Sequence, residues 1–130
     1  MIDHLVAALR SGQVERLLAP GAVLVSDGGG QVAVPLQPVH SPAEIARVIT
    51  LHCTRPGADL SVERANGRPA IVVRRSGQAQ AVLCLDVAGE VVTHLWLILN
   101  PAKLTAWHRD LPPADDAAGH TADRRADAPG

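Results

Sequence analysis

Apolar residues in the first half of the chain recur with the spacing of amphipathic helices. Over residues 2–10 they fall at i, i+3, i+4 and i+7, which is one face of a helix, and a Ser-Gly pair ends the pattern. A second, shorter helix is predicted over 14–18 and a third over 41–53. Ser41 is a favourable N-cap residue, proline follows it, and Glu44 completes the sequence of a capping box.

From residue 60 the pattern changes to the alternation and short apolar runs that are typical of strands. Four strands are predicted, over residues 60–65, 69–75, 78–87 and 90–99. The pairs Asn-Gly, Ser-Gly and Ala-Gly separate them and favour tight hairpins, so we expect an antiparallel meander. Two earlier strands are predicted over 22–25 and 32–37. The proline in the second cannot donate to a neighbour, which places that strand at a sheet edge.

Together these elements predict an α+β fold. Helices gathered on one face of an antiparallel sheet are an economical packing for this order of elements. We expect a curved antiparallel sheet of about six strands, wrapped as a cone with a cavity round three helices of the N-terminal half. At 130 residues the chain has room for one core, and we assign the domain to residues 1–109. Residues 110–130, rich in Ala, Asp and Pro, are expected to form a disordered tail.

Composition and charge exclude several classes of function. The net charge of −1 gives no bulk attraction to nucleic acid, and no apolar run approaches membrane-spanning length. We therefore expect no direct nucleic-acid partner and no membrane partner. Cys53 and Cys84 match no zinc or redox spacing and lie in apolar stretches, so we expect buried free thiols in the reducing cytoplasm. No cofactor and no metal site is predicted.

Four arginines gather on the predicted middle hairpin. They are Arg64, Arg68, Arg74 and Arg75. A basic patch can bind nucleic acid, but no aromatic residues are interleaved with these arginines to stack on bases. We therefore expect the arginines to form the solvated side of the sheet.

The segment SDGGGQ, residues 26–31, stands between two apolar runs. A phosphate-binding loop needs glycines between a strand and the N-terminus of a helix, whereas these glycines lead into a predicted strand. A turn with glycines at positive φ, in which Asp27 bonds its own backbone, is therefore favoured over a phosphate cradle or a catalytic elbow.

Three residues are candidates for a ligand pocket inside the cone: His52, His94 and Trp96. His94 and Trp96 share a face of the last predicted strand, where a histidine beside a tryptophan can bind a ligand or act as a general base. His52 lies on the apolar face of the third helix. A histidine satisfied by its neighbours is the more common role for both. Asp86 is a further candidate base, although it directly precedes a predicted turn.

Two short motifs add to this interpretation. The order of elements resembles the nuclear-transport-factor-2-like fold, which includes ketosteroid isomerases and SnoaL-like cyclases. Residues 27–30 (DGGG) and 100–104 (NPAKL) look like the DGGGK and NPDKL motifs in the C-terminal SnoaL-like domain of extracytoplasmic-function (ECF) sigma factors. The resemblance covers roughly residues 2–104. Gln31 stands where the family has Lys, and Ala102 where it has Asp, so each motif lacks one charge.

The resemblance implies a non-enzymatic regulatory module of a bacterial, cytoplasmic protein that modulates sigma-factor activity in transcription initiation. Its partners would be the helical regions of a sigma factor or RNA polymerase, and this chain carries none of those helical regions itself. The residues implied to dock on the partner are Asp27, Gly28, Gly29, Gly30, Asn100, Pro101, Lys103 and Leu104.

The alternative is a small SnoaL-like or ketosteroid-isomerase-like enzyme, or a carrier, that binds an apolar metabolite in the cone. Asp86 and His94 would then be its catalytic residues. Isomerases of this fold use an aspartate base and a Tyr with a protonated acid as oxyanion donors, and this chain contains no Tyr. The enzyme hypothesis is therefore the weaker one. A small apolar ligand and a homodimer remain open.

Overall fold

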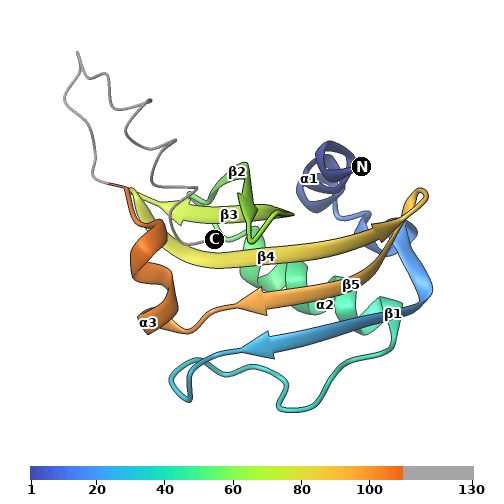
Figure 1. The fold of residues 1–130 in the computed structure, drawn as a ribbon, viewed down its shortest axis with the longest axis horizontal. Coiled ribbons are helices and arrows are strands. Elements are labelled where there is room, and N and C mark those ends of the chain that lie inside the picture. Colours follow the sequence, from blue (N-terminus) through green and yellow to red (C-terminus); the bar gives the residue numbers. More distant parts are fainter. Residues whose placement is uncertain (110–130) are drawn as a thin grey trace.

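The computed structural model describes residues 1–109 of the chain, and the tail predicted over 110–130 lies outside the described residues. The fold is α+β, with helices before the first strand, between the first two strands and after the last strand (Figure 1). The elements are α1 (Ile2–Ser11), the 3₁₀ helix η1 (Val14–Leu17), β1 (Leu18–Asp27), α2 (Pro42–Cys53), β2 (Asp59–Ala65), β3 (Arg68–Arg75), β4 (Gln78–Ala88), β5 (Val91–Ile98), α3 (Pro101–Leu104) and the 3₁₀ helix η2 (Thr105–Trp107).

The five strands form one curved, open sheet in the order β1-β5-β4-β3-β2. Strands β2 to β5 are the antiparallel meander that the sequence predicted. The first two of its hairpins turn through Asn66-Gly67 and Ser76-Gly77, and all four residues have positive φ, as a two-residue type I′ turn requires.

The sheet differs from the prediction in having five strands and mixed direction. Residues 32–37 form no strand, because the prolines at 35 and 38 have no backbone N–H to donate. Only an isolated antiparallel bridge joins Leu24 to Val39. Strand β1 instead pairs in parallel with β5, with Val25 beside Trp96. The partner of β1 is therefore β5, the last strand of the meander, and not the strand predicted over 32–37.

The start of α2 follows the predicted cap in part. The Ser41 hydroxyl accepts a hydrogen bond from the Glu44 amide at 3.3 Å, and proline occupies the first helical position. The Glu44 carboxylate binds Arg47 on the next turn and does not reach back to Ser41. The cap is therefore formed by one side chain, and the reciprocal half of the predicted box is absent at this helix.

Each face of the sheet carries its own apolar cluster. On the face that we call inner, α1 and α2 pack over side chains from all the strands, among them the fully buried Leu24, Ile71, Leu83, Leu85, Leu95 and Leu97. Burying each such side chain contributes about 1.5–3 kcal/mol, so this layer holds the helices on the sheet. On the opposite, outer face a smaller cluster includes Ala70, Val72, Val82, Cys84, Leu104 and Trp107. The C-terminal segment thus covers part of the outer face.

Candidate docking site at one end of the sheet

The SDGGGQ segment forms a tight turn directly after β1. The Gly29 amide donates to the Asp27 Oδ1 atom at 3.0 Å, and the Gln31 and Val32 amides both donate to the Gly28 carbonyl. Gly29 and Gly30 have φ values of 64° and 77°, a region that favours glycine. The predicted turn is therefore present, with Asp27 bonded to its own backbone, although irregular chain and not a strand follows it.

The second motif forms the start of α3. The Asn100 Oδ1 atom accepts a hydrogen bond from the Ala102 amide at 3.1 Å, and the Asn100 carbonyl accepts from the Lys103 and Leu104 amides. Pro101 suits the first helical position because its missing N–H would have no partner there. Leu104, 4% exposed, packs into the outer-face cluster. The sequence Asn-Pro-x-Lys-Leu is thus a capped helical turn anchored by its leucine.

The structure brings the two motifs into direct contact, although they lie far apart in the sequence. The Lys103 Nζ atom is 2.7 Å from the Asp27 Oδ2 atom, and the Leu99 amide donates to the Asp27 carbonyl at 2.7 Å. A Cβ atom on Gly29 would lie 2.4 Å from the Asn100 side chain. Asn100 therefore occupies the space that any larger residue at position 29 would need.

Lys103 also sets the electrostatics of this end of the sheet. Its hydrogen bond is the main reason why the pKa of Asp27 lies below the usual value, and the bond from Gly29 acts in the same direction. The two motifs together, residues 27–31 and 100–104, are called the docking end below. Gln31 and Ala102, the two positions where the related motifs carry charges, are both exposed on it.

The candidate pocket residues are not brought together. His94 and Trp96 lie on the outer face, where their rings stack with centroids 5.9 Å apart, and the Arg68 guanidinium lies 4.9 Å from the centre of the Trp96 ring. Arg68 also forms an ion pair with Asp86. His52 is on α2, which packs over the inner face, so the sheet separates it from His94.

Each of these candidates has an environment that explains it without a ligand. His52 is half-buried, and its pKa is lowered by burial and by the nearby charge of Arg55. His94 is exposed, and its Nδ1 atom lies 3.1 Å from the Thr93 hydroxyl. The Asp86 carboxylate is held by Arg68. The cluster of Asp86, Arg68 and the two rings is a surface ion pair with a cation–π contact, which contributes about 0.5–1 kcal/mol when exposed.

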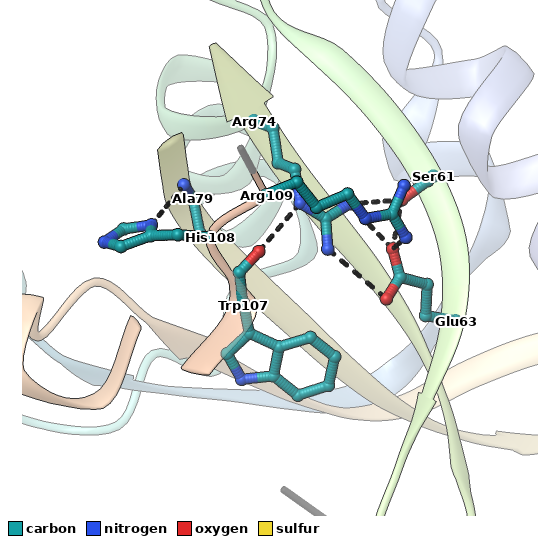
Figure 2. Close-up of polar contacts among 7 residues, drawn as sticks. All are labelled: Ser61, Glu63, Arg74, Ala79, Trp107, His108 and Arg109. Carbon is teal, nitrogen blue, oxygen red and sulfur yellow. Dashed lines mark hydrogen bonds and ion pairs between the residues drawn. The ribbon is translucent and has the colours of Figure 1, made fainter. Parts of the chain in front are cut away.

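The sequence interpretation missed a buried ionic network on the outer face. Arg74, expected to be solvated, is 6% exposed and binds Glu63 with an Nη1–Oε2 distance of 2.7 Å (Figure 2). Its Nη1 atom also donates to the Ser61 hydroxyl, and its Nε atom donates to the Trp107 carbonyl at 2.8 Å. Arg109 completes the network through the same Glu63 oxygen.

Part of this network is readable from the sequence. Alternation in the predicted hairpin places Ser61, Glu63 and Arg74 on one face of the sheet. The remaining partners, Trp107 and Arg109, come from the chain after the last strand, and no local pattern signals their return to β2 and β3.

Glu63 is ionised in this setting despite its burial. Burial alone would raise its pKa, but hydrogen bonds from Arg74 and Ser61 and the charges of Arg74 and Arg109 outweigh that effect. The net result is a lowered pKa. A buried carboxylate is tolerated only with such partners, so the network is a single structural unit.

The two cysteines are free and buried. Burial raises the pKa of Cys53 to about 12. It also raises the pKa of Cys84, where the charge of Arg68 acts in the opposite direction. Thiols with raised pKa values are poor nucleophiles at neutral pH. Within residues 1–109 no group of three or more His, Cys, Asp or Glu residues is placed to hold a metal ion. No helix of that part of the chain is long and apolar enough to cross a membrane.

Comparison with solved structures identifies the fold. The extracytoplasmic function sigma factor SigJ of Mycobacterium tuberculosis matches with a TM-score of 0.59 at 23% identity, over 80% of this chain and 42% of that chain. An NTF2-like protein of unknown function from Cytophaga hutchinsonii matches with a TM-score of 0.52 at 9% identity, over 79% and 89% of the two chains. A ketosteroid-isomerase-like protein from Kribbella flavida matches with a TM-score of 0.50 at 16% identity, over 92% and 82%.

These matches confirm the predicted SnoaL-like, nuclear-transport-factor-2-like fold, and they include an ECF sigma factor, as the two motifs indicated. No family model matches the chain, and a search of curated proteins finds no match. The chain corresponds to less than half of the length of SigJ. At these identities the likeness establishes the fold, which both sigma-factor domains and enzymes share.

Proposed function

We propose that this chain is a non-enzymatic interaction module that docks on the helical regions of an ECF sigma factor and modulates its activity in transcription initiation. The observation that supports the proposal most strongly is the contact between Lys103 and Asp27. It joins two motifs, 76 residues apart at these two positions, into one surface at one end of the sheet. This role places the chain in the bacterial cytoplasm, where transcription is initiated.

The shape of the docking end suits contact with a helix. Gly29, Gly30, Pro101 and Ala102 are exposed and small, so a partner can approach the backbone of the turn and of α3 closely. Among residues 1–109, no atom other than those of its chain neighbours lies within 4 Å of where a Cβ on Gly30 would be, so in this part of the chain that side of Gly30 faces open space. Backbone groups and small apolar groups therefore dominate this surface.

The charge of the docking end is nearly balanced. Lys103 is already paired with Asp27, and the exposed Gln31 and Ala102 carry no charge. Electrostatic attraction controls the association rate and the salt dependence of binding more than it controls affinity. We therefore expect the complex to be weak and only slightly salt-dependent.

The test is calorimetric titration of the full chain with the helical regions of an ECF sigma factor at low and moderate salt. Restoring both charges in the Gln31→Lys, Ala102→Asp double variant should raise the affinity by about tenfold and steepen its salt dependence. Lys103→Glu should lower the affinity by about tenfold or more, because it repels Asp27 and opens the contact between the motifs.

Arg47→Glu is the matched control. Arg47, like Lys103, is an exposed basic residue paired with one carboxylate, but it lies on α2, and its reversal should leave binding unchanged. The proposal is wrong if neither the parent nor the charge-restored variant binds. It is also wrong if folded Lys103→Glu binds as well as the parent.

The enzyme alternative has less support in the site. Asp86 is held in an ion pair by Arg68, His94 is exposed on the outer face, and the chain has no Tyr to stabilise an oxyanion. Turnover of a Δ5-ketosteroid at an enzymatic rate, lost in both Asp86→Asn and His94→Ala, would establish the alternative.

A further inference from the structure

The chain after β5 crosses the outer face of the sheet from one edge toward the other. We call residues 100–109, which include α3 and η2, the strap. The strand order places β1 at one edge of the sheet and β2 at the other. Lys103 binds Asp27 at the end of β1, and Arg109 binds Glu63 on β2. Figure 1 shows α3 beside the ends of β5 and β4, with the chain continuing toward β3. One short segment therefore contacts both edges.

Two apolar side chains hold the middle of the strap. Leu104 and Trp107 are 4% and 6% exposed and pack into the outer-face cluster with Ala70, Val72 and Val82 from β3 and β4. Complete burial of a tryptophan and a leucine ranks among the largest apolar contributions that a short segment can make. The strap is therefore seated on the sheet by its own core contacts.

Polar bonds fix the far end of the strap to the β3–β4 hairpin. The Arg109 amide donates to the Gly77 carbonyl at 2.6 Å, and the Ala79 amide donates to the His108 Nδ1 atom at 2.8 Å. Figure 2 shows Ala79, His108 and Arg109 beside the buried ion pair, with the Arg74 guanidinium directed at the Trp107 carbonyl. Strap and hairpin thus satisfy one another's backbone groups.

The buried ion pair is completely satisfied only when the strap is seated. The Trp107 carbonyl accepts from the Arg74 Nε atom, and Arg109 supplies the second cation on Glu63. A buried charge that loses a partner is strongly destabilised, whereas the complete network is tolerated. Burial of Arg74 therefore favours the seated strap over a detached one.

The same strap begins with the motif that supports the glycine turn. Asn100 fills the space beside Gly29, and Lys103 holds Asp27. If the far end of the strap came off the sheet, α3 would lose the contacts that follow it in the chain, and the support that Asn100 and Lys103 give to the glycine turn would weaken. The arrangement at one edge of the sheet thus depends on contacts at the other.

We infer that the strap couples the two edges of the sheet, so that Glu63 and Arg74 are positioning residues for the docking end, although Glu63 lies on the far edge strand and Arg74 on the strand next to it. Their effect on partner binding rests on the proposed function. Their effect on the order of the docking end does not, because it can be measured on the chain alone.

The first test is amide hydrogen exchange of the full chain. Arg109→Gln removes the half-buried arm of the network, and Glu63→Gln removes its buried centre. Both should speed exchange of the Gln31 amide, at the opposite edge, and of the Leu104 amide, in the strap, by about tenfold. Arg64→Gln is the control, because Arg64 neighbours Glu63 on β2 but, among the described residues, its side chain hydrogen-bonds only to the Gly67 carbonyl. Unchanged exchange at Gln31 and Leu104 in folded Arg109→Gln would overturn the inference.

The second test is a double-mutant cycle between the two edges, with Glu63→Gln and Lys103→Gln. Glu63 lies on the edge strand β2, whereas Asp27, the carboxylate that Lys103 binds, lies at the end of β1 on the other edge. Four strand spacings, roughly 19 Å, separate these two carboxylates, and changes at contacts so far apart normally have additive effects. If the strap couples them, the double variant should change Leu104 exchange by clearly less than the product of the two single changes. Additive effects would contradict the coupling.

Partner binding separates this inference from the proposed function. The same cycle, repeated for affinity to the sigma-factor helical regions, should be non-additive in the same sense. Absence of binding by the parent, with non-additive exchange, rejects the proposed function and keeps the strap. Binding that Lys103→Gln weakens, with additive exchange, keeps the function and rejects the strap.

Discussion

Gly29 is one of the residues at which the two motifs touch. Its φ of 64° favours glycine, and an added Cβ would meet the Asn100 amide group at 2.4 Å. The Asn100 amide group is the far end of a flexible side chain, but its Oδ1 atom caps α3 by accepting a hydrogen bond from the Ala102 amide. It cannot move aside without losing that bond, so the glycine at this position serves packing as well as backbone conformation.

We predict that Gly29→Ala destabilises the protein by about 3 kcal/mol, from the left-handed backbone and the displaced cap together. Gly30→Ala is the control. Its φ of 77° is equally left-handed, but the space around it is open, so only about 1 kcal/mol should be lost. Urea unfolding of both variants gives the comparison. Equal losses would show that the contact with Asn100 carries no energy.

Glu63 predicts a dependence of stability on pH. Its pKa is lowered in the fold, from an ordinary value of 4.5, so its ion pairs stabilise the protein fully above that value. This stabilisation is lost as pH falls through the lowered pKa, because the folded state must then take up a proton. At neutral pH, Glu63→Gln should lower the free energy of unfolding by about 3 kcal/mol.

The difference between the parent and Glu63→Gln should therefore shrink below pH 4.5. Denaturant titrations at a series of pH values measure it. Glu44→Gln is the control: its carboxylate is also paired with an arginine, but on the exposed surface of α2, so it should give only a small difference at any pH. A difference for Glu63→Gln that does not change with pH would contradict the ionised network.

At the scale of elements, the turn and N-cap signals in the sequence were reliable, whereas the strand predicted over 32–37 and its pairing with the first strand were wrong. The N-cap of α2 and the glycine-containing hairpins are set by residues close in the chain, and their positions agree with the prediction. The parallel pairing of β1 with β5 joins Val25 to Trp96, a distant position that carries no local signal. Short apolar alternation over 32–37 looked like a strand, but its prolines leave too few donors for a ladder.

In the candidate site, too, local features could be predicted from the sequence and long-range contacts could not. Both motifs were visible as local patterns, and the turn and the helix start can be derived from Asp-Gly and Asn-Pro chemistry. Their contact through Lys103 and the return of Trp107 to Arg74 depend on how the sheet curves. The burial of Arg74 was therefore mispredicted, because its covering segment comes from outside the hairpin.

The two type I′ hairpins predict that exchanging Ser and Asn at the first turn position has opposite effects on stability in the two turns. Ser76 and Asn66 both have positive φ, at 52° and 54°, and Asn tolerates this region better than Ser does. Ser76→Asn should therefore stabilise the protein by about 0.5 kcal/mol, and Asn66→Ser should destabilise it by a similar amount. Thermal unfolding of both variants measures the two shifts, and a loss of stability in Ser76→Asn would contradict the turn assignment.

At the scale of the whole molecule, three parts have different structural roles. The helices α1 and α2 close the inner face, the strap covers part of the outer face, and the docking end presents the two motifs at one end of the sheet. Apolar packing and a buried ion network provide the stability, while most residues of the docking end are exposed and its charges are nearly balanced. The proposed partner would contact these exposed residues, while Leu104 remains packed in the outer-face cluster.

The most direct test of docking is a hydrogen-exchange footprint of the chain in complex with the helical regions of an ECF sigma factor. The account predicts that complex formation slows exchange at Gly29, Gly30 and Gln31, and at Ala102 and Lys103, each by about tenfold or more. Exchange in the β2–β3 turn and around His94 should not change. A complex that protects the His94–Trp96 surface and leaves the glycine turn unprotected would contradict the account.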